Sequence, residues 1–161
     1  MCLQLTFSCF SIQQNSNTQK NDGSYKSISG PLKGMFFSEE NYVAYKTILK
    51  NIDHIKETSN VDDPLLILGN LNWIYMYAER PFATYSAYYL GVEPEELAAY
   101  YKKNPQKIPK YIYVMPINNY EGLQTAEESL ETERENLDLL FEYTEEKLDN
   151  AILLTVTDYK F

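Results

Sequence analysis

Two short apolar runs, Leu65–Leu68 and Tyr111–Val114, bracket an aromatic-rich segment with helix signals, and this arrangement most constrains the fold. Apolar runs of this length, bounded by turn-forming residues, are typical of strands that are buried on both faces. Helices between successive strands favour a parallel sheet with helices packed on it. The sequence therefore predicts an α/β fold: a three-layer α/β/α sandwich on a mostly parallel sheet of four or five strands, Rossmann-like in its layers.

Helix signals divide much of the chain. Ser38 precedes two glutamates and predicts the start of a helix over residues 39–56. Pro94 is likewise followed by two glutamates, and it predicts a helix that ends before Pro105. Between these two helices, we expect a short helix that carries Trp73.

The last third of the chain predicts a long acidic helix and a final strand. Thr125 has the spacing of a capping box with Glu128, and the helix should run to about Leu148. Charged residues at 133–135 interrupt its apolar stripe, so a kink or two shorter helices are alternatives. Residues 151–157 are apolar and β-branched enough for a strand, followed by a frayed end.

The first residues differ in composition from the rest of this 161-residue chain. Leu3, Leu5 and Phe7 alternate with polar residues as in a strand, whereas residues 11–24 are polar and have too little apolar area to offset the entropy cost of ordering. We therefore predict two parts. Residues 1–24 are a strand-like start with a flexible polar linker, and residues 25–161 are a single α/β domain.

Charge and hydropathy limit the partners. The chain has 14 Lys and Arg residues against 23 Asp and Glu residues, a net charge of −9. An acidic protein repels the phosphate backbone, so we expect no nucleic acid partner. No apolar run approaches the ~20 residues of a membrane span, so we expect none in this chain.

Residues for metal or cofactor chemistry are sparse. His54 is the only histidine, and Cys2 and Cys9 lie far from it, so the sequence predicts no metal site. His54 fits a partly exposed helical position better than a catalytic one. The segment Gly30–Gly34 resembles a phosphate loop, but its lysine precedes the last glycine, and no dinucleotide-binding motif occurs. We therefore expect no cofactor.

Aromatic and amide residues suggest a ligand site. The chain has 15 tyrosines against 7 phenylalanines, and tyrosine suits ligand grooves because it joins an apolar ring to a hydroxyl. A core whose rings reach the surface is the alternative for any single tyrosine. In a parallel sheet, ligands bind beyond the carboxyl ends of the strands. The candidate rim is then Ser38, Asn70, Asn72, Trp73, Thr84, Tyr85, Ser86 and Asn118.

Four segments carry a resemblance to known proteins: Gly30-Pro-Leu-Lys-Gly-Met, the residues from Leu66 to Tyr77, Arg80-Pro-Phe-Ala-Thr-Tyr-Ser, and Lys107-Ile-Pro-Lys-Tyr-Ile-Tyr. Over about residues 28–157, the chain resembles the soluble C-terminal region of uncharacterised bacterial multi-pass membrane proteins. Some of those proteins have glycosyltransferase-like membrane portions that use lipid-linked sugars. The resemblance implies a domain that follows the last membrane span on the extracytoplasmic face, and it assigns no catalytic residue.

Two functions follow as hypotheses. The first is a non-catalytic accessory or ligand-recognition domain of a bacterial membrane-associated envelope protein, whose partner is a glycan, a lipid-linked sugar or the parent membrane portion. The alternative is a small soluble enzyme, a transferase or hydrolase, which would be cytoplasmic if the chain stands alone. A third reading is an interaction module that uses the acidic helix near residues 127–147. An enzyme requires converging carboxylates, or a hydroxyl with a base, in a cleft.

Overall fold

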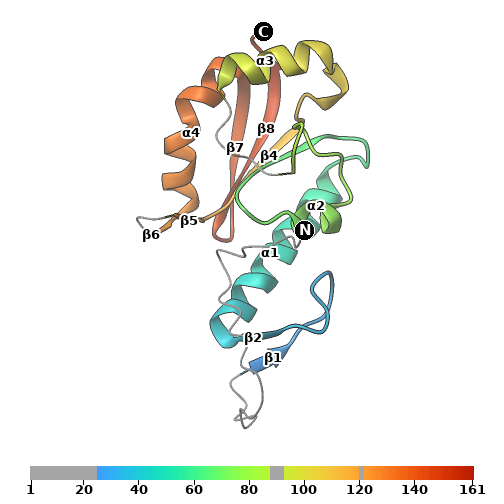
Figure 1. Cartoon of the computed structure of the whole chain (residues 1–161), viewed down its shortest axis with the longest axis vertical. Coiled ribbons are helices and arrows are strands. Elements are labelled where there is room, and N and C mark those ends of the chain that lie inside the picture. Colours follow the sequence, from blue (N-terminus) through green and yellow to red (C-terminus); the bar gives the residue numbers. More distant parts are fainter. Residues whose placement is uncertain (1–24, 88–92, 120–121) are drawn as a thin grey trace, which may run out of the picture.

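The computed structural model describes residues 25–87, 93–119 and 122–161 of the chain (Figure 1). The strand-like start and linker predicted over residues 1–24 lie outside the described residues, together with Cys2 and Cys9. The helices and strands are β1 (Tyr25–Ser27), β2 (Phe36–Ser38), α1 (Glu39–Thr58), β3 (Leu65–Leu68), α2 (Trp73–Ala78), α3 (Pro94–Lys103), the 3-10 turn η1 (Pro105–Lys107), β4 (Tyr111–Val114), β5 (Ile117–Asn119), β6 (Gly122–Gln124), α4 (Ala126–Leu140), β7 (Phe141–Leu148) and β8 (Ala151–Tyr159).

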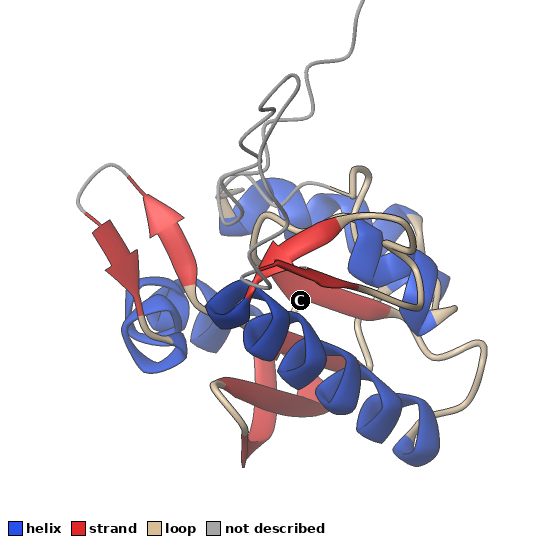
Figure 2. Ribbon diagram, turned by 90° about the horizontal axis from the view of Figure 1, so that it is seen from below, coloured by secondary structure: helices blue, strands red, loops and turns tan. Residues whose placement is uncertain are grey.

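Most of the predicted elements are confirmed. The buried strands β3 and β4 lie where the apolar runs predicted them. The long helix α1 begins after its cap Ser38, whose side chain accepts a hydrogen bond from the N–H of Asn41. Figure 2 shows the helices and strands of the described chain by type. Helix α3 has Pro94 in its first turn and ends before Pro105, as expected. The local signals of caps, prolines and apolar spacing were therefore sufficient for these elements.

The sheet corrects the predicted fold class. Its four strands lie in the order β3-β4-β8-β7. The pair β3–β4 is parallel, but β4–β8 and β8–β7 are antiparallel. The prediction of a Rossmann-like sandwich on a mostly parallel sheet is therefore wrong. The described chain forms a mixed sheet with four helices, and two-stranded antiparallel pairs, β1–β2 and β5–β6, lie outside that sheet.

The reason for the error lies between residues 141 and 148. The predicted acidic helix ends at Leu140, and the chain continues directly as β7. Aromatic and β-branched residues (Phe141, Tyr143, Thr144) favour a strand there, and a two-residue turn, Asp149-Asn150, returns the chain along β8. Asn150 has a φ of 55°, a left-handed conformation that asparagine tolerates. This hairpin makes β8 antiparallel to β7, and β8 also pairs antiparallel with β4.

Each face of the sheet buries its own apolar cluster. Leu65, Ile67 and Tyr113 pack with residues of α1 and α2 on one face. Leu66, Ile112 and residues of α3 and α4 form the cluster on the other face. Neighbouring residues of a strand point to opposite faces, so a strand as short as β3 supplies both clusters. The sheet is thus covered by helices on both sides.

The two edges of the sheet differ. Leu65 of β3 donates its N–H to the carbonyl of Pro81 at 2.8 Å and accepts the N–H of Ala83 at 2.9 Å. The N–H of Ile67 donates to the hydroxyl of Tyr75 at 2.9 Å, so side-chain and loop groups cover the outer edge of β3. Among the described residues, no strand pairs with the outer edge of β7.

Within the described ranges, none of the helices combines the length and the apolar character that a bilayer crossing requires.

Candidate functional site

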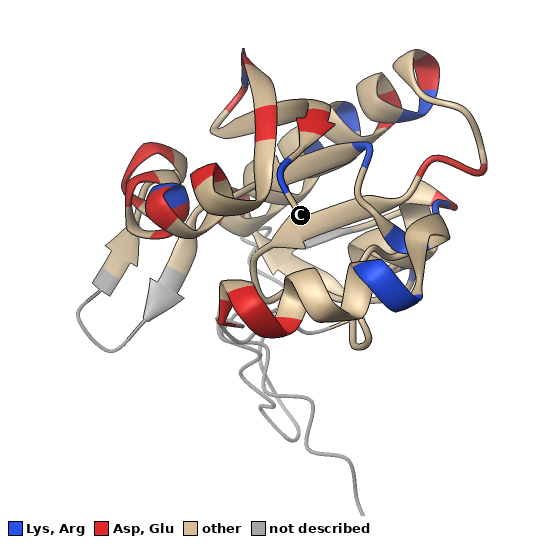
Figure 3. Cartoon of the chain, turned by 90° about the horizontal axis from the view of Figure 1, so that it is seen from above, with Lys and Arg blue, Asp and Glu red and all other residues tan. Residues whose placement is uncertain are grey.

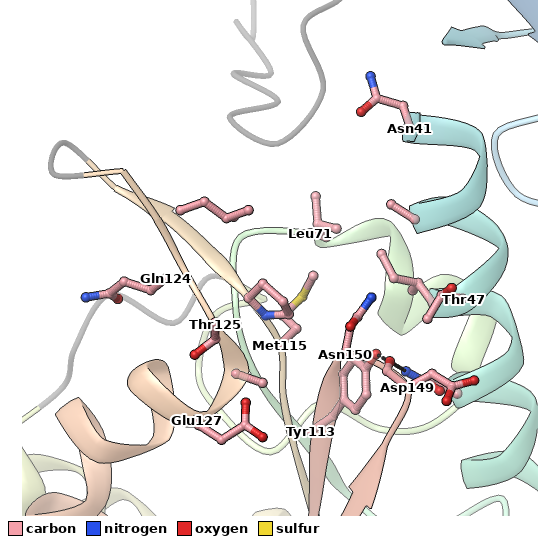
Figure 4. A pocket seen from close by; sticks show the side chains of 16 residues that line it. Asn41, Thr47, Leu71, Tyr113, Met115, Gln124, Thr125, Glu127, Asp149 and Asn150 are labelled. Atoms are coloured by element: carbon pink, nitrogen blue, oxygen red, sulfur yellow. Dashed lines mark hydrogen bonds between the residues drawn. The ribbon is translucent and has the colours of Figure 1, made fainter. Parts of the chain in front are cut away.

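An apolar cavity of about 430 Å³ lies beyond the carboxyl end of β4 (Figure 4). Helix α1 forms one wall, the segment from β6 into α4 forms the opposite wall, and the β7–β8 turn closes one end. Volumes of this order are typical of small-molecule sites. The lining residues are Asn41, Ala44, Thr47, Ile48, Asn51, Leu71, Tyr113, Met115, Pro116, Leu123, Gln124, Thr125, Ala126, Glu127, Asp149 and Asn150.

The walls are positioned by capped elements. Thr125 accepts the N–H of Glu128 at 3.2 Å, and the Glu128 carboxylate accepts the N–H of Thr125 at 2.7 Å. This capping box fixes the point at which the chain leaves β6 and enters α4. On the central side, Met115 packs against Gly69, where an added Cβ would lie 2.4 Å from Met115 Cγ. A glycine is therefore needed for Met115 to occupy its place in the cavity wall.

Two buried polar side chains meet at the base of the cavity. The Asn51 Nδ2 atom donates to the Tyr113 hydroxyl at 3.2 Å and to the backbone carbonyl of Asp149 at 2.8 Å. A carbonyl only accepts, so this second bond fixes the amide orientation and makes the Tyr113 oxygen an acceptor. Burial raises the pKa of Tyr113 to about 12, against the lowering effect of the Asn51 hydrogen bond. The Tyr113 hydroxyl therefore keeps its proton, and the described residues provide no acceptor for it.

Carboxylates at the rim are paired with lysines. Lys147 Nζ lies 3.2 Å from a Glu127 carboxylate oxygen, and Lys50 Nζ lies 2.6 Å from one of Asp149. The backbone N–H of Glu127, and then Lys147, hold the pKa of Glu127 below its usual value. Each of these carboxylates thus has a lysine beside it, so the rim carries little net charge.

Three of the predicted site residues, Ser38, Asn72 and Trp73, lie at helix starts or in the core. Ser38 caps α1, and Asn72 lies at the N-cap of α2 without a side-chain cap bond. Trp73 is buried and packs on Tyr45, with ring centroids 5.5 Å apart. Asn70 is half-buried after β3. The buried atoms Asn72 Oδ1 and Trp73 Nε1 have no hydrogen-bond partner among the described residues.

The other predicted site residues lie elsewhere. Thr84 is buried, and its hydroxyl donates to the carbonyl of Ser86. Tyr85 is exposed and packs edge-on against Tyr100. Asn118 belongs to β5, where only its backbone is described, opposite Leu123.

The predicted rim and the cavity differ in their residues. None of the predicted residues whose side chains are described lines the cavity, although Leu71, between Asn70 and Asn72, does. The signal that sequence reasoning missed is long-range: Asn51, Gln124 and Asp149 lie on separate elements that only the folded chain brings together.

A second, more open hollow lies along the exposed side of α1, lined by Ser29, Gly30, Lys46, Leu49, Lys50, Asp53, His54, Glu57 and Tyr77. Its polar groups bind one another or nearby strands. Tyr77 donates to Asp53 at 2.7 Å, and His54 Nε2 lies 3.0 Å from Glu146. His54 is partly exposed on its helix, as predicted. Across residues 25–87, 93–119 and 122–161, no group of three or more His, Cys, Asp or Glu side chains has the arrangement of a metal site.

Comparison of the chain with protein-family models, with curated proteins and with solved structures gave no match in any of the three.

Proposed function

We propose that this domain is a non-catalytic ligand-recognition domain and that its cavity beyond β4 binds a neutral ligand with one apolar face and several hydroxyl groups. A glycan or the sugar part of a lipid-linked sugar has this chemistry. The sequence resemblance supports a parent bacterial envelope protein in the membrane, with the domain on its extracytoplasmic face.

The observation that carries the proposal is the pairing of an apolar wall with a buried hydroxyl whose proton has no acceptor among the described residues. Ile48, Leu71 and Met115 offer apolar contact, while the Tyr113 hydroxyl has a proton to donate. Sites for small ligands combine apolar lining with a few placed polar groups in this way. Amides and hydroxyls at the rim suit sugar hydroxyls, which both donate and accept: Asn41, Thr47, Gln124 and Asn150.

The ion pairs at the rim favour binding over catalysis. A general acid needs a carboxyl whose pKa is raised, but Glu127 has a lowered pKa because its own N–H and Lys147 stabilise its charge. Asp149 is held by Lys50 at 2.6 Å. Neutralised carboxylates also remove any strong preference for a cationic ligand. A neutral ligand therefore fits the rim best.

A titration tests the proposal. Trp73 is the only tryptophan and belongs to the same apolar cluster as Leu71, Tyr113 and Met115, so its fluorescence reports on this region. Envelope-type mono- and disaccharides, and a short-chain lipid-linked sugar, are titrated while fluorescence and heat of binding are followed. We expect saturable binding by at least one of these ligands.

A matched pair of variants locates the binding. Ala44 lines the cavity and is exposed on α1, so Ala44→Phe fills the cavity without entering the core. Val43 is the preceding residue, is 55% exposed and does not line the cavity. We expect Ala44→Phe to abolish binding and Val43→Phe to leave it unchanged. Equal effects of the two variants, or no saturable signal with any sugar, would refute the proposal.

A further inference from the structure

The outer edge of β7 exposes backbone groups at every second residue. Val156 lies opposite Tyr143, and its N–H donates toward β4, to the Lys110 carbonyl, at 3.0 Å. In an antiparallel ladder, hydrogen-bonded and non-hydrogen-bonded pairs alternate, so Tyr143 belongs to a non-hydrogen-bonded pair with β8. Glu145 and Lys147, two and four residues further along β7, also belong to non-hydrogen-bonded pairs with β8. Their N–H and C=O groups therefore point away from the sheet, and no described strand binds them.

Helix α4 holds this edge strand in place through the side chains of the same three residues. The Tyr143 hydroxyl donates to Asp138 at 2.7 Å, and Glu145 accepts from Arg134 at 2.8 Å. Lys147 donates to Glu127 at 3.2 Å. As β7 advances, its partners move back along α4, so the helix runs antiparallel to the strand. These three contacts to α4 hold β7 in its extended conformation up to the exposed edge of the sheet.

Charge selects the kind of strand that fits this edge. Acidic residues outnumber basic ones on α4 and β7 (Figure 3). If a second copy paired through its own β7 about Thr144, Glu142 of each copy would lie opposite Glu146 of the other. Like charges directly opposite each other destabilise a strand pair, so self-pairing in this register is disfavoured. A basic strand would pair favourably, because its lysines or arginines would lie opposite Glu142 and Glu146.

We propose that the outer edge of β7 is a docking site for an extended basic segment of a partner protein, which adds to the sheet as a fifth strand next to β7. Backbone hydrogen bonds to Tyr143, Glu145 and Lys147 supply the attachment, and the acidic side chains select a basic sequence. This site is separate from the cavity and does not depend on the proposed ligand function.

A labelled peptide tests the site. The probe is a fluorescein-labelled peptide of seven residues, alternating lysine and valine, and its counterpart alternates glutamate and valine. We expect saturable binding of the basic peptide in fluorescence anisotropy, at least tenfold tighter than that of the acidic one. The amides of Glu145 and Lys147 should become at least tenfold slower in hydrogen exchange when the basic peptide is bound.

Two variants separate strand addition from general charge attraction. Glu145→Pro removes the outward N–H, which an edge strand tolerates, and Glu145→Ala keeps it. Both variants lose the pair with Arg134, so their charges match. We expect Glu145→Pro to weaken the basic peptide at least tenfold relative to Glu145→Ala, with circular dichroism showing that both are folded.

Three results would overturn the proposal. Equal affinities of the two variants would mean that the peptide binds the acidic surface by charge alone. Protection of amides elsewhere would place the peptide on another element. A dimer of the free protein that Glu145→Pro dissociates would show that the occupant is a second copy. The cavity variant Ala44→Phe should leave peptide binding unchanged, so failure of the ligand function would not affect this result.

Discussion

Asn51 and Tyr113 lie 62 residues apart in the sequence, and the amide of Asn51 donates a hydrogen bond to the Tyr113 hydroxyl at 3.2 Å. The same amide nitrogen donates to the carbonyl of Asp149 at 2.8 Å. One side chain therefore joins α1, β4 and the β7–β8 turn. Because Asn51 is 3% exposed, its two bonds replace water that the buried groups have lost.

Asn51→Ala should destabilise the fold strongly. It removes both bonds and leaves the Asp149 carbonyl and the Tyr113 hydroxyl without their donor, which costs about 2–3 kcal/mol. Asn41→Ala is the control, because Asn41 lies on the same helix and is only half-buried. Urea unfolding measures both variants. A cost for Asn51→Ala no larger than that of the control would show that the bridge contributes little.

Tyr113→Phe should separate ligand binding from stability. It removes the hydroxyl that the cavity offers, so sugar affinity should fall about tenfold, equivalent to ~1.4 kcal/mol. Tyr111→Phe is the matched control on the same strand: its hydroxyl donates to the Thr58 carbonyl at 3.0 Å, and it does not line the cavity. Isothermal titration calorimetry distinguishes them. If both variants bind sugar like the unmodified protein, Tyr113 does not contact the ligand.

The protein should lose stability in strong alkali. The pKa values of four tyrosines rise from 10.0 to about 12: Tyr75 and Tyr113 chiefly through burial, Tyr77 through its hydrogen bond to Asp53, and Tyr143 through burial and its bond to an aspartate. A raised folded pKa contributes its full stability below the unfolded pKa of 10.0 and loses it as the pH rises through about 12.

For each of the two buried tyrosines, this rise corresponds to on the order of 2–3 kcal/mol. Urea midpoints measured from pH 9 to 12, together with absorbance at the tyrosinate band, check the expectation. A constant midpoint over this range, or full ionisation of the tyrosines near pH 10, would contradict it.

Arg80→Lys should cost about 2 kcal/mol. The Arg80 guanidinium donates to Ser59 Oγ at 2.9 Å and to the carbonyls of Lys56 and Ser59 at 3.0 and 3.1 Å. It therefore supplies hydrogen-bond donors to backbone carbonyls at the C-terminal end of α1. Lysine cannot reproduce this fork of donors. Arg134 is the other arginine of the chain and pairs with exposed glutamates, so Arg134→Lys should cost less than about 1 kcal/mol. Thermal unfolding compares the two, and equal losses would count against this role of Arg80.

Gly69 and Met115 should be energetically coupled. A Cβ at position 69 would lie 2.4 Å from Met115 Cγ, so Gly69→Ala forces the methionine aside at a cost of about 1–3 kcal/mol. Met115→Ala alone leaves a cavity and costs about 2–5 kcal/mol. In the double variant the clash disappears, so the combined cost should fall short of the sum by more than 1 kcal/mol. Additive costs in urea unfolding would show that the backbone, and not Met115, absorbs the added methyl group.

Local signals determined most elements but not the sheet. The caps Ser38 and Thr125 and the proline at position 94 each predicted a helix start that the structure has. The strand β7 was missed because the capping box at Thr125 favoured one continuous helix. In β7, the side chains of Tyr143, Glu145 and Lys147 lie on one face and those of Glu142, Thr144 and Glu146 on the other. Both sets are mostly polar, so the sequence shows no alternation of apolar and polar residues that would indicate a strand. That strand decides the direction of β8 and hence the class of sheet.

The cavity was beyond what the sequence alone can predict. The sequence predicts a ligand site beyond the carboxyl ends of strands that it also predicts to be parallel. The structure has a cavity after β4. Its walls, however, come from residues such as Thr47, Gln124 and Asp149, whose proximity depends on the antiparallel β8. Because the direction of the sheet was predicted wrongly, the residues that neighbour the end of β4 were predicted wrongly as well.

The closed edge of β3 sets a limit on assembly. Tyr75 and the loop at residues 81–83 occupy its backbone groups, so within the described part of the chain the four-stranded sheet has one open edge, that of β7. Fibres grow when each unit offers two complementary ends. If two copies paired through their β7 edges, only the covered β3 edges of the combined sheet would remain. No further copy could then add to that sheet. We therefore expect the four-stranded sheet to stop extending once the edge of β7 is occupied.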